Sequence, residues 1–499
     1  MLTRIFSATP YGIESKIIAV EVAYNPGLPG MYIVGLPDTA IRESRERIRG
    51  CLRNIKSFEY PIGRIIVNLA PASLHKYGTQ FDLAIAIAIA NIKHAFSREI
   101  QRFAFIGELS LNGAVRPVKA CLAMMLAAKK EKFTAIVIPW ENAEEASYIK
   151  DIKVYAVKTV EECVRFCEGS GTLPLASTVK LSGAAPHKLL KVEKDFKNIE
   201  GLKFAKRGLE IAASGNHNIL ISGSPGLGKT LLAEAFPTIL PNLNDEQFLE
   251  VLTISGVRNH KIAQTRRPPF RAPLPGITEA AFLGGGAMVQ PGEISLAHNG
   301  VLFMDEFPEF PRAIIESLRQ PLERGIIPID RIQGRFIFPA EFILIAAQNL
   351  CPCGYYGDLR KECTCSAMRI IKYKQKISGP IIDRIDIHIR LQRTDYSTET
   401  KSESSADILK RVCSARKIQL ARNPNRTLNG KLPHTEIQNI SKLSPAVESL
   451  LRSAENAFGM SIRSRIKVLK LSRTIADMEN STNILEDHLA EALRYRFPE

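Results

Sequence analysis

A glycine-rich segment that ends in lysine and threonine is the first feature of the sequence with evident chemistry. It runs from Gly223 to Thr230 and fits the pattern G-x-x-x-x-G-K-[ST] in full. The glycines let the backbone curl so that its N–H groups face phosphate oxygens. Lys229 would reach the β- and γ-phosphates, and Thr230 would hold Mg²⁺. The residues predicted to bind ATP and Mg²⁺ here are Gly223, Ser224, Pro225, Gly226, Leu227, Gly228, Lys229 and Thr230.

Two adjacent acids, Asp305 and Glu306, follow an apolar run at residues 301–304. Acids at the C-terminal tip of a buried strand lie where ligands bind in open α/β sheets. We expect Asp305 to act on Mg²⁺ and Glu306 to polarise the attacking water as general base. The alternative is that the two acids only cap the next helix.

The apolar run at residues 342–347 is followed by an amide and then by four thiols. Asn349 would orient the water near the γ-phosphate, or it is a simple turn residue. The cysteines form C-x-C…C-x-C, and thiolates suit tetrahedral Zn²⁺, although the usual spacing is C-x₂₋₄-C. A structural zinc would fix Asn349, whereas free thiols on a loop are the alternative. The candidate zinc ligands are Cys351, Cys353, Cys363 and Cys365.

The elements that must position these residues alternate between strand and helix. A helix is expected over residues 202–214, and Gly215 would end it. Such alternation predicts a parallel sheet flanked by helices. The expected strands of this sheet are 218–222, 300–304, 342–347 and 385–391.

The whole chain divides into four segments. Residues 1–167 mix strand and helix patterns, which predicts an α/β domain. Residues 168–194 contain Gly-Ser-Gly and two prolines and are interpreted as a linker. Residues 195–393 hold the nucleotide motifs, and residues 394–499 have mainly helical spacing. The helices expected in this last segment are 405–422, 444–458, 462–478 and 484–495.

The bulk composition is that of a soluble globular protein with a net charge of +16. That charge favours a polyanionic partner such as nucleic acid, although a basic surface without special function is the alternative. Nine cysteines are too few and odd in number for a disulfide scaffold. The longest apolar run, residues 83–90, is shorter than the roughly 20 residues of a membrane span. We therefore expect a cytoplasmic protein.

Four longer strings carry a family resemblance. The chain is similar to the magnesium-chelatase-related branch of AAA+ ATPases and, more closely, to the ComM/YifB competence subfamily. The resemblance covers essentially the whole chain and implies an α/β fold with an AAA+ P-loop core and a C-terminal helical lid. It also implies a hexameric ring that moves on DNA and promotes branch migration during natural transformation. The strings are Gly284–Gly286, Pro291–Glu306, Asn349–Gly354 and Ser378–Asp386.

The resemblance assigns further roles to single residues. Asn349 matches the sensor-1 position, and Arg384 matches the arginine finger that enters the neighbouring subunit's site. Arg463 matches the sensor-2 arginine of the lid, and Arg473 on the same basic stretch is a second candidate. Each arginine is otherwise an ordinary surface charge. With Glu306, the predicted catalytic set is Glu306, Asn349, Arg384 and Arg463.

A basic stretch at residues 258–271 fits a family insertion that faces the pore of a ring. Its side chains, with the flexible Gly284–Gly286 loop, would track DNA phosphates without reading sequence. A solvated charged loop is the alternative. The family often has a histidine pair where this chain has Leu274 and Pro275, so no role of those histidines transfers. The basic residues are Arg258, Lys261, Arg266, Arg267 and Arg271.

The N-terminal segment resembles the proteolytic domain of Lon at Gly107–Pro117 and Lys76–Gly78. The nucleophilic serine of that family falls on Gln80 and its catalytic lysine on Ala123. An amide is no nucleophile and a methyl group is no base. We therefore expect a Lon-protease-like fold without protease activity that serves ring assembly or DNA contact.

Two rival functions remain open. A metal-inserting chelatase motor belongs to the same branch and needs a partner subunit that binds the porphyrin. A nucleotide-switched assembly scaffold would hold partners without translocation, although Glu306 favours turnover. The preferred DNA structure, direction of travel, ring size and protein partners cannot be deduced from the sequence.

Overall fold

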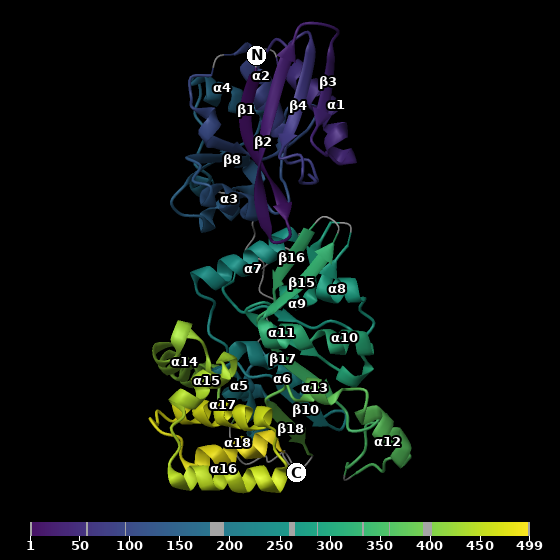
Figure 1. The fold of residues 1–499 in the computed structure, drawn as a ribbon, viewed down its shortest axis with the longest axis vertical. Helices are drawn as coiled ribbons and strands as arrows, with labels where there is room; N and C mark the ends of the chain where they lie inside the picture. The colour runs from purple at the N-terminus through teal and green to yellow at the C-terminus, as the bar shows by residue number, and fades with distance from the viewer. Residues whose placement is uncertain are drawn as a thin grey trace.

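The computed structural model of the chain forms two lobes, one above the other in Figure 1, with the amino-terminal lobe on top. The lower lobe contains a central sheet, and the C-terminal helices lie beside and below that sheet (Figure 1). The described residues are 2–55, 58–94, 96–179, 194–258, 265–286, 288–331, 334–358, 360–392 and 402–497.

The amino-terminal lobe is built on a seven-stranded mixed sheet in the order β3-β4-β2-β1-β5-β8-β9. Helix α2 (Asp82–Lys93) is buried along Asp82–Ala90, because nearly all of its side chains are apolar. The long strand β1 (Leu2–Tyr11) pairs antiparallel with β2 (Glu14–Asn25). The other elements are β3 (Gly30–Val34), β4 (Arg64–Ala70), β5 (Phe103–Phe105), β8 (Ala135–Pro139), β9 (Lys153–Val157), α1 (Thr39–Asn54), α3 (Cys121–Lys130) and α4 (Val160–Glu168).

The interpretation of residues 168–194 as a linker is wrong for its first part. Leu173 and Ala176 are buried against the amino-terminal lobe. The backbone N–H of Ala156 in β9 donates to the carbonyl oxygen of Pro174 at 3.0 Å. This stretch therefore extends the first domain, and residues 180–193 lie outside the described residues.

The lower lobe contains the expected parallel sheet, in the order β11-β14-β17-β10-β18. Ser222 pairs with Gln348, and Gly223 pairs with Leu391. The carboxyl ends of the central strands therefore meet at one edge, where the predicted nucleotide residues begin. The strands are β10 (Ile219–Gly223), β11 (Phe270–Arg271), β14 (Gly300–Met304), β17 (Phe342–Gln348) and β18 (Ile387–Leu391), and helices α5 (Lys203–Gly215) and α6 (Lys229–Ala235) flank β10 in sequence.

Insertions in this lobe contact the amino-terminal lobe. The ring of Tyr11, at the end of β1, lies 4.6 Å from that of Phe336 in the hairpin of β15 and β16. The N–H of Ala120 donates to the carbonyl oxygen of Gly256 at 3.3 Å, which joins α3 to α7. The inserted elements are α7 (Asp245–Val257), α8 (Glu279–Leu283), β12 (Gly284–Gly285), β13 (Gln290–Pro291), α9 (Glu293–Leu296), α10 (Arg312–Ser317), α11 (Arg319–Arg324), β15 (Ile326–Arg331), β16 (Gly334–Pro339), α12 (Ala367–Lys374) and α13 (Gly379–Ile382).

The carboxyl-terminal segment is helical, as predicted, and packs on α5. The hydroxyl of Tyr495 donates to the carbonyl oxygen of Phe204 at 2.9 Å, and Arg411 pairs with Glu210 at 2.5 Å. Among the described residues, no helix combines the length and apolar character that a membrane crossing requires. The helices are α14 (Ser405–Arg422), α15 (His434–Ile440), α16 (Pro445–Phe458), α17 (Ile462–Met478) and α18 (Glu486–Arg496).

Candidate functional site

The glycine-rich loop connects the carboxyl end of β10 to the start of α6. Gly226 and Gly228 have φ values of 78° and 73°, a left-handed conformation that glycine adopts without a Cβ penalty. The loop thus turns back over the sheet edge and leaves the N–H groups at the start of α6 without partners from a preceding turn. Backbone N–H groups in this arrangement are suited to phosphate oxygens.

Lys229 joins the loop to the neighbouring strand. Its Nζ donates to the carbonyl oxygens of Gly223 at 2.6 Å and Ser224 at 3.0 Å, and to Oδ1 of Asn349 at 2.9 Å. Burial lowers the pKa of Lys229, while the nearby carboxylates of Asp305 and Glu306 oppose that shift. The predicted lysine and amide therefore lie in direct contact, although 120 residues separate them in the sequence.

The two predicted magnesium ligands are also brought together. Thr230 Oγ1 donates to Oδ2 of Asp305 at 2.8 Å. A hydroxyl and a carboxylate at this separation fit Mg²⁺, which takes oxygen ligands and keeps several waters. Glu306 follows with a φ of 50°, and its N–H donates to Oδ1 of Asp305 at 2.9 Å. Strained non-glycine backbone of this kind concentrates at functional sites.

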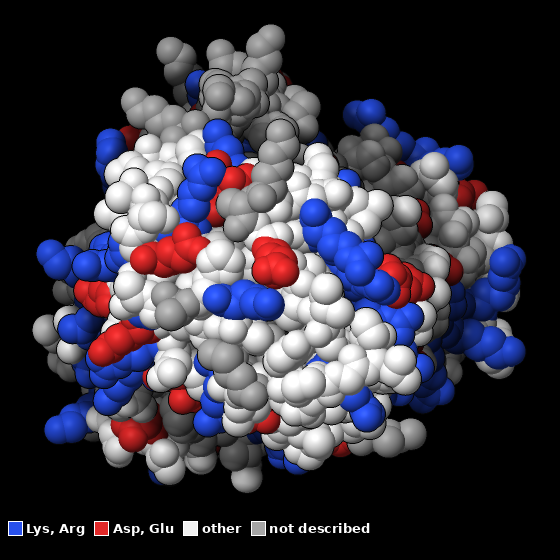
Figure 2. Space-filling view, turned by 90° about the horizontal axis from the view of Figure 1, so that it is seen from above, with Lys and Arg blue, Asp and Glu red and all other residues white. Residues whose placement is uncertain are grey.

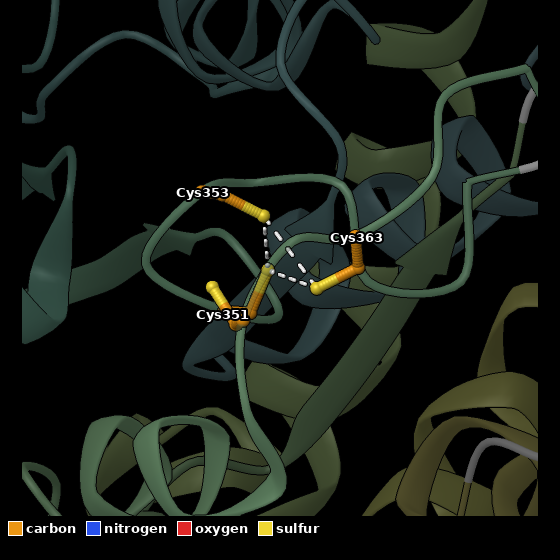
Figure 3. Close-up of side chains that lie close together, drawn as sticks. Cys351, Cys353 and Cys363 are labelled. Atoms are coloured by element: carbon orange, nitrogen blue, oxygen red, sulfur yellow. Dashed lines mark hydrogen bonds between the residues drawn. The ribbon is translucent and has the colours of Figure 1, made fainter.

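The four cysteines form a compact cluster beyond β17. Figure 3 shows the thiols of Cys351, Cys353 and Cys363 pointing toward one another. Their sulfur–sulfur distances are 3.3, 3.5 and 3.6 Å. All four ligand atoms, including that of Cys365, lie within 4.8 Å of one another. Zn–S bonds of about 2.3 Å in a tetrahedron place sulfurs about 3.8 Å apart, so the cluster is consistent with a zinc site. The backbone N–H of Tyr355 lowers the pKa of the Cys353 thiol, whereas the pKa values of the Cys363 and Cys365 thiols are raised within the cluster.

The cysteine loop packs against the phosphate loop. Gly354 has a φ of 86°, and a Cβ at this residue would lie 2.7 Å from Cγ of Pro225 and 3.9 Å from Cγ of Asn349. Its N–H donates to the carbonyl oxygen of Cys351 at 3.0 Å. A metal held by the cysteines would therefore stabilise the position of both Pro225 and Asn349. The contact with Pro225 has no signal in the sequence, because it joins loops far apart along the chain.

Arg384 and Arg463 lie together at the other end of the sheet. Arg384 Nη2 lies 2.5 Å and Arg463 Nη2 3.9 Å from Oε1 of Glu323, at the end of α11. The carbonyl oxygen of Arg384 accepts a hydrogen bond from Asn218, which precedes β10. The phosphate loop begins at the opposite end of β10, and five strand residues span about 16 Å. Neither arginine therefore lies beside the phosphate loop of its own chain, and sequence reasoning did not single out Glu323.

Arg473, the second candidate for the lid arginine, is a buried structural residue. Its side chain is 2% exposed. Its Nε lies 3.1 Å from Oδ1 of Asp477, and its Nη1 donates to the carbonyl oxygen of Thr482 at 2.9 Å. All these contacts hold the lid together, so the assignment of Arg473 to the nucleotide site is wrong.

The basic stretch at residues 258–271 is partly engaged within the protein. Arg258 Nη1 donates to the carbonyl oxygen of Pro291 at 2.9 Å. Arg271 makes two bonds to Glu293, at 2.7 and 2.9 Å. These contacts argue against Arg258 and Arg271 as residues that track phosphates, and Lys261 lies outside the described residues.

The amino-terminal lobe has no hydrolytic pair at the two positions expected from sequence. Gln80 is 6% exposed and donates from Nε2 to the carbonyl oxygen of Tyr77 at 2.6 Å. Ala123 is 3% exposed and belongs to a small apolar cluster with Ala120 and Val257. At these two places the lobe therefore carries a packed amide and a packed methyl group.

Three family models match the chain in succession. The model described as "Subunit ChlI of Mg-chelatase" matches residues 20–142, and "Magnesium chelatase, subunit ChlI" matches residues 195–399. "Magnesium chelatase, subunit ChlI C-terminal" matches residues 402–496. These matches support an α/β protein with a ChlI-like amino-terminal domain, a chelatase-type ATPase core and a helical carboxyl-terminal domain.

ComM and YifB relatives align over nearly the full length of this chain, whereas a magnesium-chelatase subunit aligns over a smaller part of it. Competence protein ComM of Haemophilus influenzae is 38% identical over 99% of this chain and 97% of its own length. The protein YifB of Escherichia coli is 37% identical with the same coverage. The magnesium-chelatase 67 kDa subunit of Chlorobaculum parvum is 28% identical over 31% of this chain and 23% of its own length. The similarity to ComM and YifB therefore extends over the amino-terminal lobe, the core and the lid.

Proposed function

Because the chain belongs to the ComM/YifB family of magnesium-chelatase-related AAA+ ATPases, we propose that it is a ring-forming motor on DNA. The family implies ATP hydrolysis with Mg²⁺. In this proposal Lys229 and the loop bind the phosphates, and Thr230 and Asp305 hold Mg²⁺. Glu306 removes a proton from the attacking water, and the amide of Asn349 orients that water.

The observation that best supports a ring-shaped assembly is that the predicted site residues are separated into two groups. Lys229, Asp305 and Asn349 lie at the carboxyl edge of the sheet, whereas Arg384 and Arg463 lie at its amino edge. A guanidinium stabilises charge that develops on the γ-phosphate only when it is in contact with it. In a ring, the amino edge of one copy faces the carboxyl edge of the next, and each site is completed by its neighbour. On the basis of the family resemblance, we propose that the ring is a hexamer.

DNA is the polymer along which we propose that this motor moves. The chain has a net charge of +16, which favours a polyanion, and the relative from Haemophilus is named a competence protein. Branch migration or a helicase-type step during natural transformation and recombination is the activity we propose. The amino-terminal lobe is, in this view, a Lon-protease-like fold that has kept its architecture as a scaffold, since Gln80 and Ala123 replace the catalytic pair.

The cysteine cluster is proposed to bind a structural zinc ion. Its four sulfurs provide a complete tetrahedral ligand set, and structural zinc sites are closed in this way. The zinc would supply rigidity and no chemistry. Through Gly354, its loop would hold Pro225 and Asn349 at fixed distances from the phosphate groups.

A mixing experiment tests the shared site. Lys229→Ala should abolish nucleotide binding, and Arg384→Ala should remove hydrolysis while leaving binding intact. When the two inactive proteins are mixed, some interfaces combine an intact phosphate loop with an intact Arg384, and ATP hydrolysis should partly return. Arg369→Ala, a change of the same type at an exposed position of α12, should remain active. No recovery on mixing, or full activity of Arg384→Ala, would reject the trans assignment.

A second measurement separates the DNA motor from its rivals. The ATP hydrolysis rate is compared with and without single-stranded and branched DNA. Stimulation by DNA supports the motor. A chelatase-type metal-insertion motor or a nucleotide-switched scaffold predicts a rate that DNA does not change, and the absence of both stimulation and binding rejects the proposed function.

A further inference from the structure

A basic groove lies on the amino-terminal lobe, away from the nucleotide site. Three arginines of α1, Arg45, Arg49 and Arg53, are spaced four residues apart and so follow one face of the helix. The opposite face of α1 is buried, with Ile41, Ile48 and Leu52 among its core residues. Successive arginines are about 6 Å apart along the helix axis, because each residue rises about 1.5 Å. The helix therefore presents a row of positive charge and is held in place by its apolar face.

Two loops form the facing wall. The N–H of Gly30 at the start of β3 donates to the carbonyl oxygen of Gly63 at 3.1 Å, which holds the loops before β3 and β4 side by side. Tyr32 in β3 and Tyr60 in the loop before β4 also line this side of the space, and Tyr60 packs in part against the core of the lobe. The space between wall and helix has a volume of about 370 Å³ and is lined by Arg45, Glu46, Arg49, Arg53, Tyr32 and Tyr60, among others. A groove of this size accommodates part of an extended chain.

The positive charge of the groove is only partly neutralised. Arg45 Nε lies 3.0 Å from Oε1 of Glu46, and both side chains are at least half exposed. Within the described parts of the chain, Arg49 and Arg53 have no ion pair with an acid. Burial raises the pKa of Tyr60, and the positive charges of Arg49 and Arg53 oppose that shift. Two arginines remain available to an anionic ligand.

Aromatic rings accompany these charges. The guanidinium carbon of Arg53 lies 5.5 Å from the centroid of Tyr60, and that of Arg64 lies 5.1 Å from the centroid of Tyr32. Tyr32 is 51% exposed, and Ile62 at the rim is 74% exposed. Figure 2, which views this end of the molecule, shows several groups of Lys and Arg with groups of Asp and Glu between them. A phosphate or an acidic peptide needs only the arginines, whereas tyrosine rings also suit flat, stacking ligands.

We propose that this groove binds a single-stranded segment of nucleic acid. Arg49 and Arg53 contact successive phosphates, and Tyr32 and Tyr60 stack against bases. Basic grooves with aromatic side chains bind single strands without reading sequence, because every base has a face that stacks. The inference rests on the proposed function in one respect, that the motor acts on DNA, and adds a second contact on the amino-terminal lobe. Such a contact would hold a strand while the ATPase ring moves it.

The test uses the full-length protein, a fluorescein-labelled oligothymidylate and fluorescence anisotropy at several salt concentrations. Each phosphate contact contributes about 0.7 to the slope of log affinity against log salt for a single strand. Arg49→Gln/Arg53→Gln should therefore reduce the slope by about 1.4. Tyr60→Ala should weaken binding about tenfold through lost stacking. ATP hydrolysis without DNA should not change in either variant.

The matched control removes the same charge from the same lobe. Arg102→Gln/Arg165→Gln alters two exposed arginines outside the groove and should leave the slope unchanged. A second readout is photocrosslinking of a bromouracil oligonucleotide to the unmodified protein, which should label the peptide that contains Tyr32 or Tyr60. Unchanged slope and affinity in the groove variants, or crosslinks only elsewhere, would overturn the groove and leave the motor standing. If the unmodified protein binds no DNA at all, both proposals fail.

Discussion

A buried ion pair between the lid and the core offers a direct test of how this protein positions Arg384 and Arg463. Asp386 is 5% exposed and accepts hydrogen bonds from the N–H of Asn218 at 3.0 Å and from Nζ of Lys467. Burial alone would raise the pKa of Asp386, but Lys467 and His217 outweigh it and hold that pKa well below its usual range. The carboxylate is therefore charged in the folded protein and depends on Lys467.

The perturbation is Lys467→Ala. Removing one partner of a buried pair leaves an uncompensated charge and costs about 3–5 kcal/mol. The change should also reduce ATP hydrolysis, because the pair joins the two segments that carry Arg384 and Arg463, the arginines proposed to complete a neighbouring site. Asp386 lies two residues after Arg384, and Lys467 lies one helical turn after Arg463 on α17.

The assay is denaturant unfolding of the lid and core, followed by a steady-state ATPase measurement. Lys467→Met/Asp386→Asn removes both charges and should cost much less than the single change. As a control, Lys410→Ala breaks an exposed pair with Asp407 on α14 and should cost at most about 1 kcal/mol. A loss below about 1 kcal/mol for Lys467→Ala, or no difference between the single and double variants, would refute this reasoning.

Three further outcomes are expected. Glu306→Gln should still bind ATP but lower its turnover by about 10²- to 10⁴-fold, as measured by phosphate release, because an amide is no general base. Glu309→Gln changes an exposed neighbour and should retain activity. Equal losses of turnover in the two variants would contradict the assignment of Glu306. Cys353→Ser should lower both the amount of bound zinc, measured by elemental analysis, and the ATPase rate. Cys413→Ser removes an exposed thiol on α14 and should change neither quantity. If the unmodified protein, purified without chelators, holds no metal, the zinc site is rejected. Burial, with Arg496, lowers the pKa of His388 from 6.5 to about 3, so between these pH values the unfolded chain binds one proton more than the folded protein does. The free energy of unfolding should therefore fall by up to about 1.4 kcal/mol per pH unit as pH drops below about 6.5. A His388→Asn variant whose free energy of unfolding depends on pH with the same slope would exclude this cause.

The residues proposed to bind the phosphates were predictable because their motifs are local. A strand, a glycine-rich turn and a helix start follow one another between Ile219 and Ala235, and each depends on neighbours in sequence. Asp305 and Glu306 were predictable for the same reason. Apolar residues bury β14, and its carboxyl end lies at the edge of the sheet where ligands bind in open α/β sheets. The expected strand 300–304 and the helices 405–422 and 462–478 agree with the structure at both ends.

Elements without strong periodicity were harder to predict. Strand β1 alternates only weakly, and its partner β2 decides that it is a strand. Residues 171–179 have a linker's composition, yet Leu173 and Ala176 pack into the first lobe. In both places contacts with distant residues determined the local structure, as they do wherever tertiary packing overrides local preference.

By itself, the sequence determined that this chain carries a complete phosphate loop, an acid pair at a strand tip and four cysteines in a short segment. Only the tertiary structure decided how these parts combine. It buried Arg473 in the lid, and it placed Arg384 and Arg463 beside Glu323, at the end of the sheet opposite the phosphate loop. The physical reason is that the burial of a side chain and the distances between charges depend on the order of the strands in the sheet and on how the helices pack against it. Arg473 thereby becomes a buried structural group of the lid, whereas Arg384 and Arg463 share the carboxylate of Glu323.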